Sequence, residues 1–242
     1  MNSKKAARIV GTLFILAAVT AVIGSFVFYD PVLNDSNYLV KSSEHANQVL
    51  LGALMELILV VSAIGTATTM FPILRKYNET IALWHVCFRF LEAIIITVGV
   101  ISVLSLVTLG REYVSAGASD IASFQASSII LKAIHDWTFM LGPLFMLGIN
   151  TIMYSYIFYK SKLVPRLIPI LGMTGAALVF LCALLVMFGV IAQVSFWGGI
   201  LALPVAANEM ILAVWLIVKG FNQSALASMS LKTKRTEIVV HS

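Results

Sequence analysis

Six long runs of apolar residues constrain this chain more than any other feature. They cover approximately residues 9–29, 48–71, 81–109, 137–158, 167–191 and 198–218. Each run holds at least the roughly 20 residues that a helix needs to cross a hydrocarbon core about 30 Å thick. Of the 242 residues, 60% are hydrophobic and 11% are charged, whereas a soluble domain carries about 25% charged residues. The sequence therefore predicts an all-α polytopic membrane protein, a bundle of six transmembrane helices.

The distribution of lysine and arginine predicts the orientation of the bundle. Twelve of the 16 lie in the N-terminal segment, the second-to-third and fourth-to-fifth connections, and the C-terminal end. The alternate connections hold only Lys41, Arg111 and Lys132. Because positive residues stay on the cytoplasmic side, we expect both termini in the cytoplasm and the protein in the cell membrane. The same clustering argues against a nucleic-acid partner, despite the net charge of +5.

One domain is expected. The transmembrane domain would occupy residues 1–220, and residues 221–242 would form a flexible basic cytoplasmic tail. The N-terminal run resembles a signal peptide, but its apolar core is about 20 residues long, so we expect an uncleaved first span. The longest connections would be the outer loops at about 30–47 and 110–126. A weakly amphipathic stretch at 119–136 is expected to extend the fourth helix outward.

A charged stripe interrupts the third apolar run. Arg89 and Glu92 are three residues apart, and His85 precedes Arg89 by four, so the three share one side of a helix. A charged side chain deep in a bilayer costs at least about 2.5–3.5 kcal/mol on insertion scales. The stripe must therefore face a polar partner, although we place His85 itself at the cytoplasmic interface and not in the core.

Other polar residues could supply that partner. Arg89 has five N–H donors, which one carboxylate cannot satisfy. From its depth, Glu209 in the sixth run is the first candidate for a second acceptor, and Glu56 in the second run is the next. Asn208 adds uncharged polar capacity beside Glu209. Two interpretations stay open: a buried ion-pair network that sets helix register, or a polar cavity that binds a ligand or moves a proton.

A second polar group lies at the start of the fourth run. His135 and Asp136 are predicted near the outer interface, pointing about 100° apart on the helix. Contact with water explains them best, and a metal or catalytic role is the sharper alternative. The chain lacks a Walker A loop, H-E-x-x-H, G-x-S-x-G and any metal-spaced Cys/His cluster. The sequence therefore predicts no metal and no cofactor.

Several short segments, in order, resemble a bacterial integral membrane family known only as domain of unknown function (DUF) 4386. The resemblance covers roughly residues 6–222. It is carried by ARIVG at 7–11, FRFLEA at 88–93, KSKLVPR at 160–166 leading to Gly172, Asn208-Glu209, and WLIVKGFN at 215–222. Family members often have glycine where this chain has Asn208. The resemblance implies the fold and no mechanism.

These observations favour a small binding or transport protein with its site at Glu56, Arg89, Glu92 and Glu209. Arg89 would hold an anionic group or a carboxylate, and a glutamate would exchange protons with a small-molecule or proton ligand. The alternative is a non-enzymatic sensor or accessory subunit, as a homo-oligomer or with a membrane partner protein, whose buried charges are structural. The third class is an intramembrane enzyme that acts on a lipid or quinone through His135, Asp136 or Glu56. Without a recognisable nucleophile, enzymatic activity is the least supported.

Overall fold

The computed structural model describes residues 2–116 and 121–240, with side chains up to residue 231 in the second range. Within these ranges the chain is helical, and six helical units are long and apolar enough to cross a membrane. The elements in chain order are α1 (Ser3–Val22), the π-helix η1 (Ile23–Tyr29), α2 (Asp30–Leu33), α3 (Tyr38–Glu44), α4 (Ala46–Leu74), α5 (Glu79–Ala116), α6 (Ile121–Met140), the π-helix η2 (Leu141–Met146), α7 (Leu147–Ser161), α8 (Leu167–Met187), α9 (Phe196–Val218) and α10 (Gln223–Val240). The prediction of an all-α bundle with six membrane-spanning helices is confirmed.

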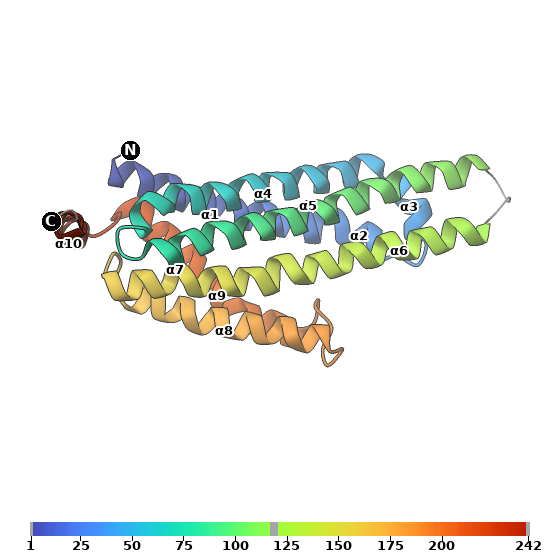
Figure 1. Cartoon of the computed structure of the whole chain (residues 1–242). Helices are drawn as coiled ribbons and strands as arrows, with labels where there is room; N and C mark the ends of the chain where they lie inside the picture. The colour runs from blue at the N-terminus through green and yellow to red at the C-terminus, as the bar shows by residue number, and fades with distance from the viewer. Residues whose placement is uncertain (1, 117–120, 241–242) are drawn as a thin grey trace.

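The six units form a closed ring. α1 packs against α4, α4 against α5, and α5 against the continuous unit made by α6, η2 and α7. α7 then packs against α8, α8 against α9, and α9 returns to α1. Figure 1 shows the start of α1 and helix α10 at the same end of the bundle, which we call the terminal end; the opposite end is the distal end. Side chains that point into this ring are removed from lipid.

The units differ in length, so the two ends of the bundle differ. At 1.5 Å per residue, the 38 residues of α5 span about 57 Å, whereas the 21 residues of α8 span about 31 Å. In Figure 1 the α8–α9 hairpin stops well short of the distal end. Beyond it, α3 and the ends of α5 and α6 pack around a separate apolar cluster that includes Leu39, Val103 and Leu106. This distal projection extends past the length that a bilayer core requires.

Several predicted boundaries change. The loop expected at about 110–126 is helix as far as Ala116 and again from Ile121, because apolar residues of α3 and α6 give both helices a surface to pack on. As expected, the amphipathic stretch extends the fourth unit, and its residues 119–120 lie outside the described residues. The loop expected at 30–47 contains α2 and α3. The fifth span ends at Met187, just before Gly189 adopts φ +70°.

The C-terminal segment forms a further helix. Helix α10 occupies most of the range where a flexible tail was expected. Its first turns are anchored, because Ala225, Leu226 and Met229 are buried in the core cluster at the terminal end. Because the segment is mostly polar, the packing of these three apolar residues could not be predicted from its sequence.

Two proline residues coincide with interruptions of the helical hydrogen bonding. Proline has no N–H, so it leaves the carbonyl four residues earlier without its helical donor. Pro31 follows η1 and frees the Val27 carbonyl, and Gln48 Nε2 lies 3.4 Å from that oxygen and 3.0 Å from the Phe28 oxygen. Pro143 lies within η2, and Gln193 Nε2 donates to the freed Phe139 oxygen at 3.0 Å. Side-chain amides from neighbouring segments thus satisfy the freed carbonyls.

Helices α8 and α9 approach each other closely where Gly175 faces Pro204 and Val205. A Cβ atom on Gly175 would lie 2.6 Å from the backbone nitrogen of Val205 and 2.8 Å from the carbonyl carbon of Pro204. Backbone atoms at this distance cannot move aside without shifting a helix. Gly175 therefore sets the spacing between α8 and α9, as small residues do between helices in membranes.

We predict that Gly175→Ala destabilises the protein by about 1–3 kcal/mol through overpacking against the α9 backbone. Gly199→Ala is the matched control, because nothing lies within 4 Å of a Cβ atom at that helical position. The control should leave stability unchanged or raise it by about 0.5–1 kcal/mol. Reversible unfolding in mixed micelles measures both. Equal stability of the two variants would contradict the close contact at Gly175.

Candidate functional site

The charged stripe of the third span lies on the buried side of α5. His85, Arg89 and Glu92 are 0%, 4% and 3% exposed. They face the inside of the ring because α5 packs there against α4, η2 and α7. The sequence spacing of four and three residues brings them onto this one side, and no lipid contact is left for the two charges.

Arg89 and Glu92 form a buried ion pair within α5. Arg89 Nη1 donates to both carboxylate oxygens of Glu92, at 2.8 Å and 2.9 Å. Asn150 on α7 donates from Nδ2 to Glu92 Oε2 at 2.5 Å. Glu92 is therefore held by a charged donor from its own helix and by a neutral donor from the next helical unit. This arrangement ties α5 to α7.

Glu209 supplies a second carboxylate from α9. Its Oε1 lies 4.0 Å from Arg89 Nη2, which is within ion-pair range but too long for a hydrogen bond. Glu209 accepts no hydrogen bond from any residue that the structure describes, and its side chain is 15% exposed. Arg89 thus faces two carboxylates that differ in how they are held: Glu92 is fixed, and Glu209 is loose.

Uncharged polar groups surround the pair without completing its hydrogen bonds. Asn208 Nδ2 lies 3.4 Å from the hydroxyl of Tyr154, and the backbone of α8 approaches closely because Gly172 has no Cβ to meet Ser155 and Asn208. Among the described residues, the buried atoms here without a hydrogen-bond partner include Arg89 Nε, Asn150 Oδ1, Ser155 Oγ and Asn208 Oδ1. Buried polar atoms are normally hydrogen-bonded. Several unpaired ones close together therefore indicate an interior that can bind water or a polar ligand.

Glu56 lies apart from this cluster, so the structure brings together three of the four residues that the sequence suggested as one site. Glu56 lies 18 residues before the end of α4 at the terminal end, and Arg89 lies ten residues after the start of α5 at that same end. At 1.5 Å per residue their depths differ by about 12 Å. Glu209 lies nine residues before the end of α9, and so matches the depth of Arg89. The position of Glu56 within its apolar run does not by itself reveal this difference in depth from Arg89.

Glu56 belongs instead to a second polar cluster nearer the distal end. It is 6% exposed and lies in electrostatic range of Tyr29 from η1 and His135 from α6. The rings of Tyr29 and His135 meet edge to face, with centroids 5.4 Å apart. Tyr29 could not be recognised from the sequence, because a tyrosine near the end of an apolar run is typical of an ordinary interfacial anchor.

His85, expected near the cytoplasmic interface, is buried among the helices. Its ring packs edge to face on Tyr154, with centroids 5.7 Å apart. The inward side of α5 continues one turn beyond Arg89, and Tyr154 of α7 covers His85 there. The two histidines His85 and His135 lie in separate clusters.

His135 and Asp136 are closer than their helical directions suggest. His135 Nδ1 lies 3.6 Å from Asp136 Oδ1, although the ring is buried and the carboxylate is 55% exposed. Asp136 also accepts from Lys132 Nζ at 2.8 Å, one turn earlier on α6. Among the described residues, no group of three or more His, Cys, Asp or Glu side chains is arranged to hold a metal ion.

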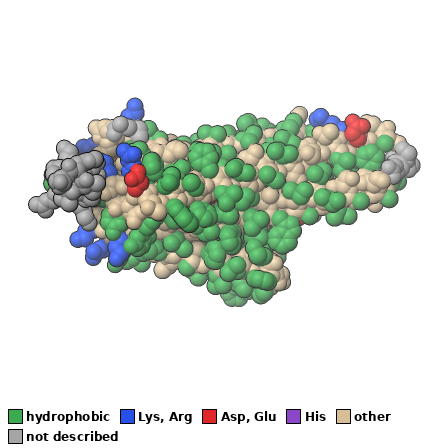
Figure 2. All heavy atoms as spheres, in the orientation of Figure 1, with side chains coloured by type: hydrophobic (Ala, Val, Ile, Leu, Met, Phe, Trp, Pro, Cys, Tyr) green, Lys and Arg blue, Asp and Glu red, His purple; other side chains and the backbone are tan. Residues whose placement is uncertain are grey.

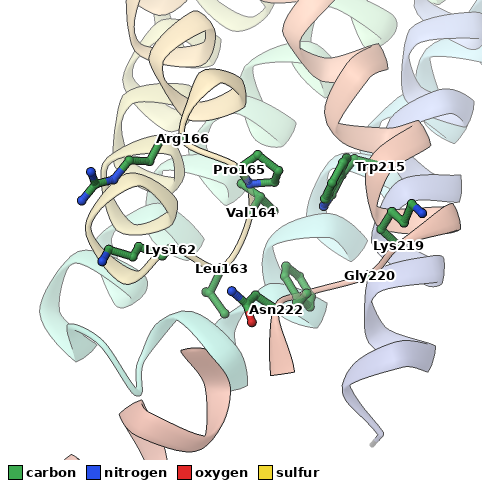
Figure 3. A pocket seen from close by; sticks show the side chains of 10 residues that line it. Lys162, Leu163, Val164, Pro165, Arg166, Trp215, Lys219, Gly220 and Asn222 are labelled. Atoms are coloured by element: carbon green, nitrogen blue, oxygen red, sulfur yellow. The ribbon is translucent and has the colours of Figure 1, made fainter. Parts of the chain in front are cut away.

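A cavity of about 560 Å³ opens at the terminal end, between the α7–α8 connection and the end of α9. Figure 3 shows Lys162 and Arg166 pointing to one side of it and Lys219 to the other, so these cations flank the opening without converging. Asn222 N donates to the Leu163 oxygen at 2.9 Å. This bond joins the KSKLVPR and WLIVKGFN segments into one structural corner.

Residues 9–220 match a family described as "Domain of unknown function (DUF4386)". The matched range includes most of the first membrane-spanning helix, all of the other five, and both polar clusters. Comparisons with curated proteins and with solved structures find no match.

We predict that Glu92→Gln destabilises the protein by about 3–5 kcal/mol, because it leaves the buried Arg89 charge without its closest partner. The control is Lys132→Gln, which breaks the partly exposed pair with Asp136 and should cost less than about 1 kcal/mol. Unfolding titrations of both variants in the same detergent measure the difference. A cost for Glu92→Gln as small as that of the control would show that Arg89 is solvated.

Proposed function

The chain belongs to the DUF4386 family, and we propose from its own residues that it is a small membrane binding or transport protein whose cargo is a proton or a small cation. The exchanging group is Glu209. One observation carries this proposal: inside the ring a single guanidinium faces two carboxylates.

The charge balance points to a positively charged cargo. Arginine side chains remain protonated in proteins, so Arg89 carries a positive charge. Glu92 already compensates this charge through two short contacts. If Glu209 is ionised as well, the cluster carries one uncompensated negative charge in an apolar interior, which is costly. A proton or a cation removes that charge. An anionic cargo, the other possibility raised by Arg89, would have to displace Glu92.

The way in which the two carboxylates are held assigns their roles. Glu92 has three close donor contacts, from Arg89 and Asn150, and its movement would break all of them. Glu209 has only the 4.0 Å approach to Arg89, and its side chain retains some exposure. Glu209 can therefore change partners at low cost, while Glu92 keeps Arg89 in place. The unpartnered oxygens of Asn150, Ser155 and Asn208 offer a cation further acceptors close by.

The proposal includes an orientation in the cell membrane with both termini in the cytoplasm. Figure 2 shows most of the visible Lys and Arg side chains at the terminal end and a broad hydrophobic surface over the middle of the molecule. This distribution supports the positive-inside expectation. In that orientation the Arg89 cluster lies nearer the cytoplasmic side.

Proton movement can be measured with the full chain in vesicles that enclose a pH-sensitive dye, under an imposed membrane potential. We expect potential-driven proton flux with the unmodified protein and a loss of at least about tenfold with Glu209→Gln, because the amide cannot exchange a proton. Radiolabelled small cations form a parallel arm in the same vesicles.

Glu112→Gln is the matched control, since it removes an exposed carboxylate on the distal projection. This control should transport like the unmodified protein. Glu209→Gln should keep its melting temperature within a few degrees, because Glu209 makes no hydrogen bond to lose. Absence of both proton and cation flux from a folded, reconstituted protein, or flux that Glu209→Gln leaves unchanged, would refute the proposal and leave the buried charges a structural role.

A further inference from the structure

A small cavity lies on the distal side, away from the Arg89 cluster. It measures about 70 Å³, room for a few small atoms. Its walls come from η1 and α2, from α6, and from the α8–α9 connection, and include Phe26, Tyr29, Asp30, His135, Phe139 and Val194. Both proline-associated π-helices adjoin this region, since Tyr29 ends η1 and Phe139 lies just before η2. Irregular helical turns of this kind are frequent at functional sites.

Several buried polar atoms at or behind this cavity have no hydrogen-bond partner in the part of the chain that the structure describes. Tyr29 is 3% exposed, and its hydroxyl interacts with the neighbouring Glu56 carboxyl, while its oxygen receives no donor from any described residue. Glu56 Oε2 and His135 Nε2 are likewise buried and without a hydrogen-bond partner. Buried polar groups are normally hydrogen-bonded, so the unpaired atoms of Tyr29 and His135 on the cavity wall indicate a ligand with hydrogen-bond donors.

The charge around the cavity is negative. Asp30 accepts from the side-chain amide of Asn34, which is neutral, and it forms no ion pair with any residue that the structure describes. Asp136 is compensated by Lys132 at 2.8 Å. Glu56, behind Tyr29, also lacks a cationic partner among the described residues, apart from His135 should that ring be protonated. Asp30 on the cavity wall, with Glu56 behind Tyr29, therefore favours a cation in the cavity.

The cavity lies at the level of a membrane surface. Val194 belongs to the loop between α8 and α9, and the neighbouring Gln193 is bonded to the Phe139 carbonyl. Since α8 is only about as long as a bilayer core is thick, the loop after it marks the end of that core. Phe26 and Val194 are 54% and 62% exposed on the outside of the bundle. The site can thus be reached from the aqueous side and from the lipid headgroups.

We propose that this cavity binds the primary ammonium group of a small amine, with Asp30 and the Tyr29 hydroxyl as its principal acceptors. An ammonium group has three N–H donors, which match the unpaired acceptors, and a positive charge that the aromatic walls favour. A bare metal ion fits less well, because the described residues provide no group of three metal-ligating side chains. The amine can be free in solution or can belong to an aminophospholipid headgroup. This site does not depend on the proposed role of Glu209.

The test uses ethanolamine as the free probe, titrated calorimetrically into the full chain in detergent, with ethylene glycol as the neutral analogue. We expect saturable binding of ethanolamine only, weakened at least about tenfold by Asp30→Asn and by Tyr29→Phe, each of which removes one charge-assisted contact. Glu112→Gln, an exposed carboxylate elsewhere on the distal projection, should bind ethanolamine as the unmodified protein does.

A lipid arm separates the two sources of the amine. The protein is incorporated into nanodiscs of mixed lipid composition and then released from them in the mass spectrometer. Native mass spectrometry identifies the lipids that remain bound. Retention of phosphatidylethanolamine over phosphatidylglycerol, lost in Asp30→Asn, would assign the headgroup; ethanolamine binding without lipid preference would assign a free amine. The proposal is overturned if neither arm shows an amine preference. It is also overturned if Asp30→Asn leaves the preference intact; Asp30 is only partly buried, so this substitution spares the core.

Discussion

A guanidinium held inside an apolar ring is the constraint to which the rest of this structure responds. Arg89 cannot lose its charge, and lipid cannot solvate it, so neighbouring helices have to provide the compensation. Glu92 does so from the same helix, Asn150 secures Glu92 from α7, and Glu209 approaches from α9. The relative depths of three helices are therefore linked through one side chain. Removing Glu92, the partner that Arg89 contacts most closely, exposes the cost that the arrangement offsets.

The acidic residues of the interior belong to the two polar clusters, which form two layers at different depths along the bundle. One layer contains Arg89 and has a fixed and a loose carboxylate. The other contains Glu56, with Tyr29 and His135, and has no permanent positive charge among the described residues. The second layer lies where prolines interrupt two helices and glutamine side chains replace the lost backbone donors. Helical irregularity and unpaired polar atoms coincide there, and this coincidence separates the distal cavity from an ordinary packing defect.

The sequence predicts the large features because lipid imposes a simple rule on them. Apolar runs of sufficient length define the six spans, and the spacing of His85, Arg89 and Glu92 places them on one side of α5. The residue depths that select Glu209 can also be counted along the chain. The position of Glu56 and the burial of His85 could not be predicted, because both depend on the axial offset between neighbouring helices. Tyr29 and Asp30 acquire their roles only when η1 and α6 come together, which no local pattern records. The anchoring of α10 likewise depends on three apolar side chains in a polar segment.

The central claim is that Glu92 and Glu209, although both face Arg89, behave differently: one remains an ionised partner, and the other exchanges its proton. Infrared difference spectroscopy of the reconstituted protein, recorded on a change of bulk pH and assigned with Glu92→Gln and Glu209→Gln, observes the two carboxyl groups directly. The account predicts a reciprocal carboxylic acid and carboxylate signal that disappears in Glu209→Gln, with the carboxylate bands of Glu92 unchanged. A signal that survives in Glu209→Gln and disappears in Glu92→Gln, or no carboxyl signal at all, would contradict it.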